Sequence, residues 1–579
     1  MTPGHDTMDN LLIARVFSEI GDLLELKGEN PFKIRAYRTA ADIVGQTGER
    51  VADLADAELR AIPGIGKTVA AKIRELADTG QLAFQQELLE EFPSTILDLL
   101  RLQGVGPKTV ARLYRELGIS SLDALETAAA EGRLRGLRGL GAKKEQLMLR
   151  AVAEYRRREG RFPMPDVQDI ADALAEHLRG ADPDLQVTPV GSLRRGCETC
   201  GDTDLLVAGT DLAILERFAA YPGVDRVLGR GETKASVLLT NGLQADLRLV
   251  PSESLGAALQ YFTGSKAHNI ALRDRAIQRG LKLNEYGVYR LDTGERVAGA
   301  TEPEVYAALA LPFIPPELRE DRGEIAAAGT DTLPHLVSRG DLRGDLHAHT
   351  TESDGRADLD AMAVAAREAG LEYLAITEHS KSLAMANGLD ERRTLAHARQ
   401  IRDADARLDD ITLLAGIECD ILPDGALDLA EDCLAQLDIV VASVHSAFSQ
   451  EEREMTDRLL RAVESPVVDV IGHPTGRLLR RRDPYRVNIE EVIGAAAAHG
   501  VALEINSQAD RLDLSDAHAR LARERGVSVV ISSDAHATNA FGLLRWGVVV
   551  ARRAWLEPEH VLNTRSVEAL RAALRRNRN

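Results

Sequence analysis

The chain has 579 residues, of which 44% are hydrophobic, and a formal net charge of -19 at pH 7. This length is several times what one hydrophobic core holds, so we expect three or more folded units. The sequence has no run of about 20 apolar residues and no basic N-terminal segment before an apolar run, so we expect neither a membrane span nor a signal peptide. Its four unevenly spaced cysteines are too few for a disulfide framework. These features predict a cytoplasmic protein.

The negative charge by itself argues against a partner as anionic as DNA, because Lys and Arg side chains that neutralise phosphates dominate such binding. An average, however, conceals local basic clusters and carboxylates that bind cations. Basic residues do cluster within residues 33–38, 194–195 and 477–482. Net charge therefore leaves nucleic-acid binding open.

Residues 8–160 are predicted to form short amphipathic helices interrupted by glycine. In residues 62–68 and 102–109 two glycines flank one apolar residue directly before a helix, and residues 137–143 are a looser third copy. Such a loop lets backbone N–H groups and a helix N-terminus face one phosphate. The residues predicted to bind DNA in this way are Gly64, Gly66, Lys67, Gly104, Gly106 and Lys108.

These segments resemble the helix-hairpin-helix motif, which grips the sugar-phosphate backbone without recognising sequence. The alternative is a pair of glycine-terminated helices that only pack together. Residues 30–38, which lead into the first copy, resemble the small lyase domain of polymerase beta, and Lys72 stands where that domain keeps its Schiff-base lysine. Because Thr68 replaces a lysine expected beside it, the alternative for Lys72 is a solvated helix residue.

From about residue 163 the sequence changes to apolar strands. Asp202 and Asp204 alternate with apolar residues, which places both carboxylates on one face of a strand, and Asp246 lies in a second such alternation. Three converging carboxylates repel one another unless divalent cations lie between them, and two cations are what an in-line phosphoryl transfer needs. The sequence therefore predicts a catalytic site with Mg²⁺ or Mn²⁺ at these aspartates, and Asp246 as general base.

Residues 191–201 contribute phosphate ligands to this site: the Ser192 hydroxyl, the Arg195 guanidinium and backbone donors that include Gly201. A glycine-serine turn with two arginines, followed by two aspartates with one residue between them, is typical of nucleotidyltransferases. The alternative is an ordinary strand pair with exposed aspartates. Cys197 and Cys200 form a Cys-x-x-Cys, but no second close pair exists, so we predict no zinc there.

Residues 261–265, 269–280 and 313–325 resemble the family X DNA polymerases, and with the preceding motifs the resemblance covers nearly all of residues 8–325. It implies that Tyr261, Phe262 and Gly264 pack on the sugar of the incoming nucleotide. It also implies that Asn269 reaches the base, Arg273 the template strand and Arg161 the triphosphate. Lys266 departs from the family, since polymerase beta has an acidic residue there.

Beyond residue 341, strand-like and helix-like segments alternate seven times, which predicts a parallel barrel. Most of the apolar runs end in a His or an acidic residue, where barrel enzymes place catalysis. A lone histidine is usually a core residue, but this clustering favours metal binding. The predicted ligands are His347, His349, Asp354, His379, Glu418, His445, His473, Asp534 and His536.

This layout resembles the PHP domain, and its residues permit three divalent metals. One is expected at His347, His349, Glu418 and Asp534, a second at Glu418, His445 and His473, and a third at Asp354, His379 and His536. Zinc and manganese both suit these ligands. Such a cluster activates hydroxide against phosphorus. Residues 477–482 are predicted to guide a DNA strand towards it.

The predicted fold is multidomain: an α-helical helix-hairpin-helix region, an α/β nucleotidyltransferase palm and thumb, and a distorted (β/α)7 barrel of PHP type. The expected boundaries are 1–84 (lyase-like domain), 85–162 (fingers-like DNA-binding domain), 163–252 (palm), 253–325 (thumb), 326–341 (linker) and 342–579 (PHP domain).

The resemblance implies a DNA-directed DNA polymerase that fills short gaps in repair, using gapped or primer-template DNA and deoxynucleoside triphosphates. The PHP domain would add 3′–5′ exonuclease or end-processing activity. The alternative is a DNA phosphoesterase whose polymerase module mainly binds DNA. We expect a nucleoid-associated monomer.

Overall fold

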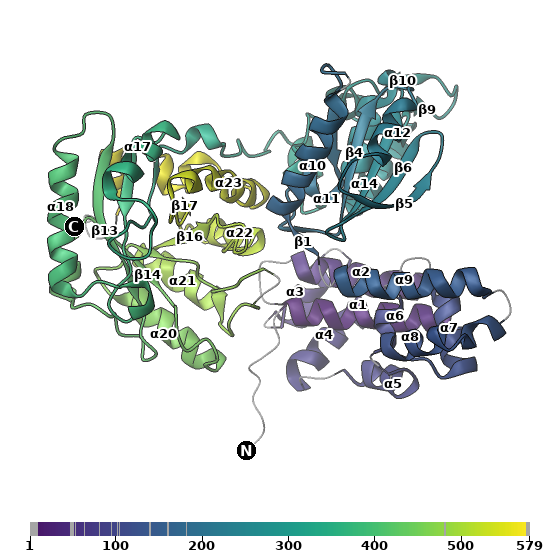
Figure 1. Ribbon diagram of the computed structural model, residues 1–579, viewed down its shortest axis with the longest axis horizontal. Coiled ribbons are helices and arrows are strands. Elements are labelled where there is room, and N and C mark those ends of the chain that lie inside the picture. Colours follow the sequence, from purple (N-terminus) through teal and green to yellow (C-terminus); the bar gives the residue numbers. More distant parts are fainter. Residues whose placement is uncertain are drawn as a thin grey trace. The chain divides into compact units, whose positions relative to one another are not determined.

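The computed structural model in Figure 1 describes residues 10–46, 51–52, 54–62, 64–79, 82–93, 95–100, 102, 105–137, 140–158, 161–180, 182–479 and 482–574. Its contacts divide the chain into two compact units, Met1–Glu159 and Gly160–Asn579. None of the described helices is long and apolar enough to cross a lipid bilayer.

The described elements of the first unit are all helical, as the sequence predicts. They are α1 (Asn10–Lys27), α2 (Pro31–Gln46), α3 (Asp56–Ala61), α4 (Lys67–Thr79), α5 (Ala83–Glu91), α6 (Ile96–Leu100), α7 (Pro107–Leu117), α8 (Leu122–Ala130), the 3-10 turn η1 (Arg133–Gly136) and α9 (Ala142–Arg158). On α1, Ile13, Phe17, Ile20 and Leu24 recur every three or four residues and are buried, which gives the helix one apolar face towards the core.

The palm is a five-stranded sheet with the order β2-β4-β7-β6-β5. Strand β4 (Asp202–Ala208) runs parallel to β7 (Gln244–Val250), and the other pairs are antiparallel. The remaining palm elements are β1 (Phe162–Pro163), α10 (Met164–Arg179), β2 (Val187–Val190), α11 (Gly191–Arg194), β3 (Thr199–Cys200), α12 (Ala213–Ala219), β5 (Val224–Arg230) and β6 (Lys234–Leu239). Apolar residues of α10 pack on the sheet, and at the start of β4 Asp202 is exposed and Asp204 half-buried, whereas Asp246 on β7 is buried.

The thumb has its own small core, around Val305 and Tyr306. Its elements are η2 (Ser252–Ser254), α13 (Leu255–Thr263), α14 (Lys266–Gln278), β8 (Leu281–Asn284), β9 (Gly287–Arg290), β10 (Arg296–Ala298), α15 (Glu302–Ala308), η3 (Pro316–Leu318) and α16 (Glu324–Gly329). Gly256 lets α13 lie directly against the start of α15, because a Cβ there would come within 2.0 Å of the Thr301 carbonyl carbon. This close approach sets the direction of α13, which carries Tyr261 and Phe262.

The C-terminal part forms the predicted parallel barrel of seven strands, paired in chain order. The strands are β11 (Gly344–Asp345), β12 (Tyr373–Ile376), β13 (Thr412–Asp420), β14 (Ile439–Ser443), β15 (Val470–Ile471), β16 (Ala502–Asn506) and β17 (Val529–Ser532). A parallel bridge between Ala348 and Ala535 brings the first and last strands together and nearly closes the barrel. All strand ends that carry predicted metal ligands therefore meet at one mouth.

Helices surround the barrel strands (Figure 1). They are α17 (Leu359–Glu368), α18 (Glu391–Asp405), α19 (Glu431–Leu434), α20 (Glu452–Glu464), α21 (Ile489–His499), α22 (Asp516–Glu524), α23 (Leu544–Arg553) and α24 (Val567–Ala573), with the 3-10 turns η4 (Arg339–Asp341), η5 (Ala384–Ala386), η6 (Thr538–Leu543), η7 (Pro558–His560) and η8 (Leu562–Thr564). The buried apolar cluster of the barrel is continuous with that of the palm. Val337, inside the predicted linker, is fully buried and donates its N–H to the Leu556 carbonyl, so this segment packs on the barrel.

Candidate active sites in the palm and the barrel

The palm site starts from two paired strands. Asp202 and Asp204 lie two residues apart on β4, and Asp204 is the register partner of Asp246 on β7. Residues two apart on a strand share a face, so the fold directs these carboxylates to the same end of the sheet. Within the described chain, the three do not form a group whose ligand atoms all lie within 4.8 Å of one another. Instead, Nζ of Lys234 lies 2.5 Å from Oδ2 of Asp246.

Electrostatics distinguish Asp204 from an ordinary surface aspartate. Burial, and then the charges of Asp202 and Asp246, raise the pKa of Asp204 to about 6, while Lys234 and Arg248 oppose the rise. A second and third negative charge nearby make ionisation of a half-buried carboxyl costly. A divalent cation relieves this cost, so the residues present fit the predicted metal site.

The turn between β2 and α11 lies close to these carboxylates. Gly191 has a φ of 66°, and a Cβ at this position would be 3.0 Å from Oδ2 of Asp204. Glycine meets both conditions without strain, so the backbone at the start of α11 can lie against Asp204. On the other side of the loop, the Arg161 guanidinium donates to Oγ1 of Thr199 at 2.9 Å, near Gly201.

The two arginines of this turn are already paired with the thumb. Arg194 donates to both carboxylate oxygens of Glu302, at 3.0 and 2.6 Å. Nε of Arg195 donates to Oε1 of Glu320 at 2.9 Å, and its Nη1 donates to the Thr263 carbonyl at 2.6 Å. The thumb thus fixes the position of the guanidinium predicted to hold the triphosphate.

The thumb residues predicted to contact the nucleotide are linked to one another. Asn269 is held from both ends, because its Nδ2 donates to the Tyr261 carbonyl at 2.7 Å and its Oδ1 accepts from Gln260 at 2.7 Å. Arg273 is exposed, and its Nε donates to the Asn269 carbonyl at 3.1 Å. Gly264 lies beside Arg195: a Cβ on it would be 3.2 Å from the arginine Nη1.

Phe262 is covered by a cation. The Arg248 guanidinium carbon lies 4.4 Å from the centroid of the Phe262 ring. Tyr261 meets the same ring edge-on, with 5.1 Å between centroids. The two aromatic rings therefore form one half-buried apolar surface at the end of α13.

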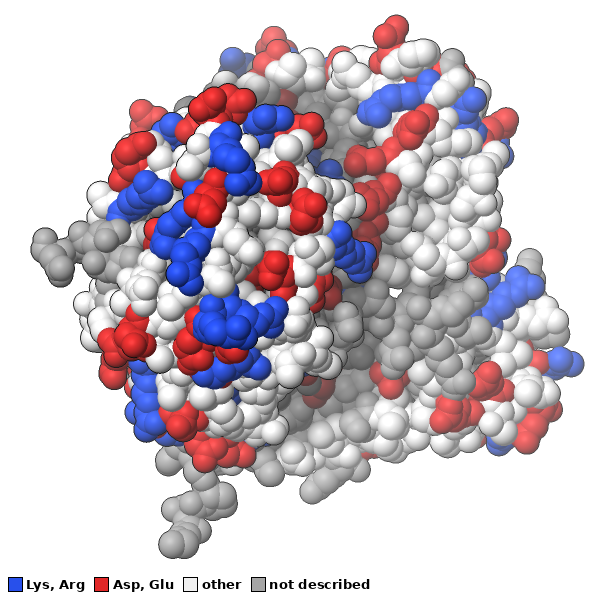
Figure 2. Space-filling view, turned by 60° about the vertical axis from the view of Figure 1, so that its left-hand side comes forward, with Lys and Arg blue, Asp and Glu red and all other residues white. Residues whose placement is uncertain are grey.

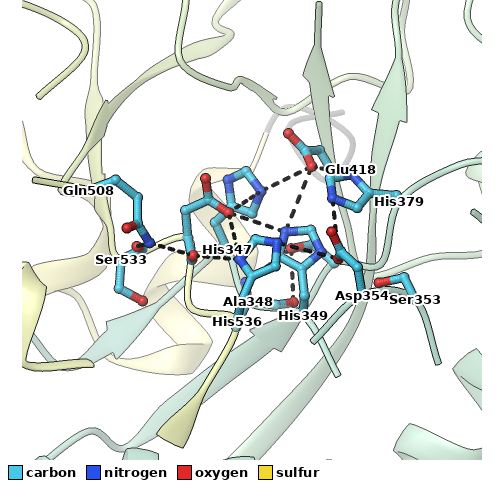
Figure 3. A network of polar contacts seen from close by, with 12 residues as sticks. His347, Ala348, His349, Ser353, Asp354, His379, Glu418, Gln508, Ser533 and His536 are labelled. Carbon is cyan, nitrogen blue, oxygen red and sulfur yellow. Dashed lines mark hydrogen bonds and ion pairs between the residues drawn. The ribbon is translucent and has the colours of Figure 1, made fainter. Parts of the chain in front are cut away.

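In the barrel, the nine predicted ligands lie in one network at the carboxyl ends of the strands, part of which Figure 3 shows. Glu418 on β13 is at its centre. Its Oε2 lies 2.8 Å from Nδ1 of His379 and 3.4 Å from Nε2 of His347, and its Oε1 lies 3.3 and 3.1 Å from Nε2 of His445 and His473.

Asp534 and Asp354 hold the remaining imidazoles. Oδ1 of Asp534 lies 3.2 Å from Nε2 of His349. Oδ1 of Asp354 lies 3.5 Å from Nε2 of His379 and 3.3 Å from Nε2 of His536. A carboxylate within reach of several imidazoles is the arrangement in which neighbouring divalent metals share ligands.

The geometric groups divide the ligands slightly differently from the sequence prediction. His347, His349 and Asp534 form one group, and His349 also joins Asp354, His379 and His536 in a second. The third group contains His379, Glu418 and His445, with His379 in the place expected for His473. His349 thus belongs to the first and second groups and His379 to the second and third, and the two rings stack with centroids 4.3 Å apart.

Several ligand atoms in this network are fully buried without a hydrogen-bond partner. They are Nε2 of His347, both ring nitrogens of His349, Nδ1 of His379, Oε2 of Glu418 and Nδ1 of His473. Buried polar atoms are normally satisfied, and metal coordination is one way to satisfy them. Burial and two neighbouring histidines, His379 and His536, lower the pKa of His349 to about 4, which keeps its ring nitrogens free of a second proton. The residues thus fit a polynuclear metal centre.

In the first unit, three of the four hairpin glycines predicted to contact phosphate lie within the described residues. Gly64 has a φ of 92°, and a Cβ there would lie 2.3 Å from Cδ1 of Ile43, so a residue with a side chain would be strained there. Gly66 and Lys67 are exposed at the start of α4, while Ile65 between the glycines is buried. Gly106 is exposed directly before α7, which begins at Pro107 and includes Lys108. Gly104 lies outside the described residues.

Among the described residues, basic side chains are interspersed with acidic ones on the face seen in Figure 2. Arg194 and Arg195 are paired with thumb glutamates. Arg477, predicted to guide DNA, is buried and donates to Glu198 at 2.6 Å and to the Leu512 carbonyl, so it is not free to hold a strand.

Comparisons with known proteins match separate parts of the chain to separate domain families. Family models match a helix-hairpin-helix domain at residues 8–82, a SAM-like helix-hairpin-helix tandem at 96–154, a DNA polymerase beta palm at 161–250, a DNA polymerase beta thumb at 258–320 and a PHP domain at 345–508. The chain is 39% identical to "DNA polymerase/3'-5' exonuclease PolX" of Bacillus subtilis (strain 168), over 98% of this chain and 99% of that protein. This chain belongs to the family X DNA polymerases.

Other relatives of this family X polymerase match a smaller share of it. A "Probable phosphatase" of Shewanella sediminis (strain HAW-EB3) is 32% identical over 237 residues, which cover 39% of this chain and 91% of that protein. A "Probable phosphatase" of Thermoanaerobacter sp. (strain X514) is 30% identical over 40% of this chain and 89% of that protein. About two fifths of this chain thus matches nearly the whole of each of these proteins.

Two residues that orient the ligands of this family X polymerase were not predicted from its sequence. Glu504 accepts from Nδ1 of His347 at 2.7 Å and from the N–H of His473 at 2.6 Å. Asp420 lies 3.0 Å from Nδ1 of His445. A partner on the second ring nitrogen fixes the direction of the first. The signal was present, since Asp420 follows Glu418 by two residues on one strand face and Glu504 lies near the end of β16.

The raised pKa of Asp204 predicts how metal binding in the palm depends on pH. Because the proton competes with the cation for the carboxylate, affinity for Mn²⁺ should be constant above about pH 7 and fall roughly tenfold per unit below about pH 6. Free Mn²⁺ measured by electron paramagnetic resonance checks this at pH 5 to 8. Asp204→Asn serves as reference, because barrel sites contribute equally to both proteins. A pH-independent difference between the two would contradict the electrostatics described.

Proposed function

We propose that this protein is a DNA-directed DNA polymerase that fills short gaps in DNA, acting in the cytoplasm at the nucleoid. The proposal is supported most directly by the register of β4 and β7, which sets Asp204 opposite Asp246, with Asp202 on the same face. The family and the helix-hairpin-helix units support a DNA substrate. Gapped or primer-template DNA and deoxynucleoside triphosphates are the proposed substrates.

In the proposed reaction, the primer 3′-oxygen attacks the α-phosphorus of the nucleotide and pyrophosphate leaves. Asp202, Asp204 and Asp246 would hold divalent cations, which would neutralise charge on the attacking and leaving oxygens. Asp246 accepts the hydroxyl proton, and Lys234 together with Gln244, whose Nε2 lies 3.2 Å from Oδ1 of Asp246, holds that carboxylate in place.

The proposed nucleotide-binding residues are those gathered between palm and thumb. Ser192, Arg195 and the Gly201 backbone bind the triphosphate, with Arg161 close by. Tyr261, Phe262 and Gly264 pack on the sugar, and the amide of Asn269 reaches the base. Arg273 is exposed and available to the template strand.

Substitution of Asp202 tests the polymerase proposal. Asp202→Ala should reduce primer extension on gapped DNA by about a thousandfold or more, because a cation ligand at the reacting centre is lost. Extension with Mg²⁺ or Mn²⁺ measures this. Asp225→Ala, at an exposed aspartate on the edge strand β5 of the same sheet, is the matched control and should behave as wild type. Equal extension by both variants would favour the alternative, a DNA phosphoesterase in which the palm mainly binds DNA.

We propose a second activity, 3′–5′ exonuclease or end-processing hydrolysis, in the PHP domain. Its support is the network of nine ligand residues around Glu418, with unpartnered buried ring nitrogens. Zn²⁺ or Mn²⁺ ions held by these residues would supply the electrophilic activation of a phosphodiester. Glu504 and Asp420 orient His347 and His445 for this task.

Substitution in the barrel separates the two activities. His347→Ala with His349→Ala should abolish 3′ trimming of single-stranded DNA while primer extension stays within about twofold of wild type, because the two histidines lie at the barrel mouth and not in the palm. His499→Ala, at an exposed histidine of α21, is the control. Trimming that survives the double substitution would assign hydrolysis to another site.

One observation favours a third activity, abasic-site cleavage by Lys72. Its Nζ lies 4.3 Å from the Phe84 ring centroid, and burial, with a contribution from the charge of Lys33, lowers the pKa of Lys72. A lysine with a lowered pKa has more of the neutral amine needed to form a Schiff base. We propose this role on that ground.

Borohydride trapping on abasic DNA tests the role of Lys72. Lys72→Ala should lose the covalent adduct completely. Lys33→Ala should only slow its formation at neutral pH, because removal of that charge lets the pKa of Lys72 rise. An adduct that persists in Lys72→Ala would disprove the assignment.

A further inference from the structure

Helix α23 of the PHP domain ends in two consecutive arginines that both meet the thumb. Nε of Arg552 lies 2.7 Å from Oε1 of Glu317, and Nη1 of Arg553 lies 2.9 Å from Oε1 of Glu320. The two pairs belong to the same helix and the same contact surface. Only the second pair involves a carboxylate that also binds Arg195.

Arg553 contacts the palm turn as well. Its Nη1 donates to the main-chain carbonyl of Arg195 at 2.7 Å. The approach depends on Gly196, which has a φ of 68° and whose Cβ would come within 2.2 Å of Cγ1 of Val549 on α23 and 3.5 Å of Cδ of Arg553. Glycine at this position thus lets the barrel helix lie against the turn that carries the triphosphate arginine.

These side chains form an alternating series of charges. Arg195 pairs with Glu320, Glu320 with Arg553, and Arg553 with Asp516, whose Oδ2 lies 3.1 Å from the Arg553 Nη2. Asp516 in turn accepts from Nη1 of Arg322 at 2.9 Å. Three cations and two anions leave one net positive charge. The centre of the series is buried, since Arg553 is 7% and Glu320 6% exposed.

Within this series, Arg553 is the main counterion of Glu320. Burial by itself would raise the pKa of Glu320, but Arg553 first and Arg195 second outweigh it and lower the pKa to about 2. Glu320 is therefore charged at every pH at which the protein works. Arg195 and Arg553 both lie 2.9 Å from Oε1 of Glu320, so this carboxylate does not depend on Arg195 alone for compensation.

We propose that Arg553 is a positioning residue for nucleotide binding in the palm: it neutralises Glu320 and holds the Arg195 backbone, so that Arg195 can bind the triphosphate. This inference rests on the proposed role of Arg195. A guanidinium has five N–H donors, and Arg195 uses three of them, for Glu320, the Thr263 carbonyl and Sγ of Cys197. Without Arg553, Arg195 alone would compensate Glu320 in this series, and the carboxylate would repel the incoming phosphates.

Steady-state filling of a one-nucleotide gap by the full-length protein tests this role. Arg553→Gln should raise the KM for the nucleotide about tenfold with kcat within about twofold, because attraction of the triphosphate is lost before and in the transition state alike. Arg553→Lys should recover part of the loss, since it keeps the charge but not the forked contacts. Arg552→Gln is the matched control and should leave KM unchanged. An equal rise for both would mean that only loosening of the contact surface matters.

A double substitution separates charge from packing. Adding Glu320→Gln to Arg553→Gln should return KM towards wild type, because the carboxylate that Arg553 compensates is gone. A KM that stays raised, or rises further, overturns the proposal. Should Arg553→Gln not fold, Arg553→Lys alone decides: the proposal expects a smaller rise in KM with kcat within about twofold, and an unchanged KM overturns it. If Arg195→Gln leaves KM unchanged, the proposed role of Arg195 fails. If Arg195→Gln raises KM and Arg553→Gln does not, only the present inference fails.

Discussion

Both sites depend on parallel pairing of strands in register. In the palm, the pairing of β4 with β7 sets Asp204 opposite Asp246, although 41 residues lie between these two aspartates in the sequence. In the barrel, the same rule applied to seven strands brings ligands from residue 347 to residue 536 to one mouth. The barrel ligands follow the carboxyl ends of their strands, whereas the palm aspartates lie near the amino ends of β4 and β7. In both sites equivalent ends of parallel strands share an edge, so polar residues placed there converge.

Convergence of like charges has a cost that each site meets differently. The predicted metal ligands of the palm are all carboxylates, and Lys234 and Arg248 offset part of their repulsion around Asp204. The barrel alternates carboxylates with imidazoles, so that Glu418 is within reach of four histidines. Burial lowers the pKa of His349, whereas Glu418 and Asp354 outweigh burial and raise the pKa of His379 to about 10. Neighbouring imidazoles thus differ in affinity for protons, and a metal must displace a proton from some but not from others.

Much of the architecture could be predicted from local patterns. Strand alternation located Asp202, Asp204 and Asp246, and the histidines at the ends of apolar runs located the barrel mouth; the predicted fold class is confirmed, while the residue roles stay predictions. Contacts between distant segments could not be predicted in this way. The pairing of Lys234 with Asp246 requires the order of β6 and β7, and the grouping of His379 with His445 requires that both approach Glu418. Arg477 was predicted to guide DNA because the sequence alone does not show which arginine of a basic run is buried, here against Glu198.

The apolar core shared by palm and barrel bears on how the two activities can be separated by dissection. A chain cut near residue 341 would expose the apolar surface that Val337 and α23 now cover. It would also separate Glu317 from Arg552 and Glu320 from Arg553. Loss of synthesis in such a fragment would then report a damaged polymerase half and say nothing about whether hydrolysis assists synthesis. For this molecule, point substitution is the informative way to silence one half, since deletion removes part of the other.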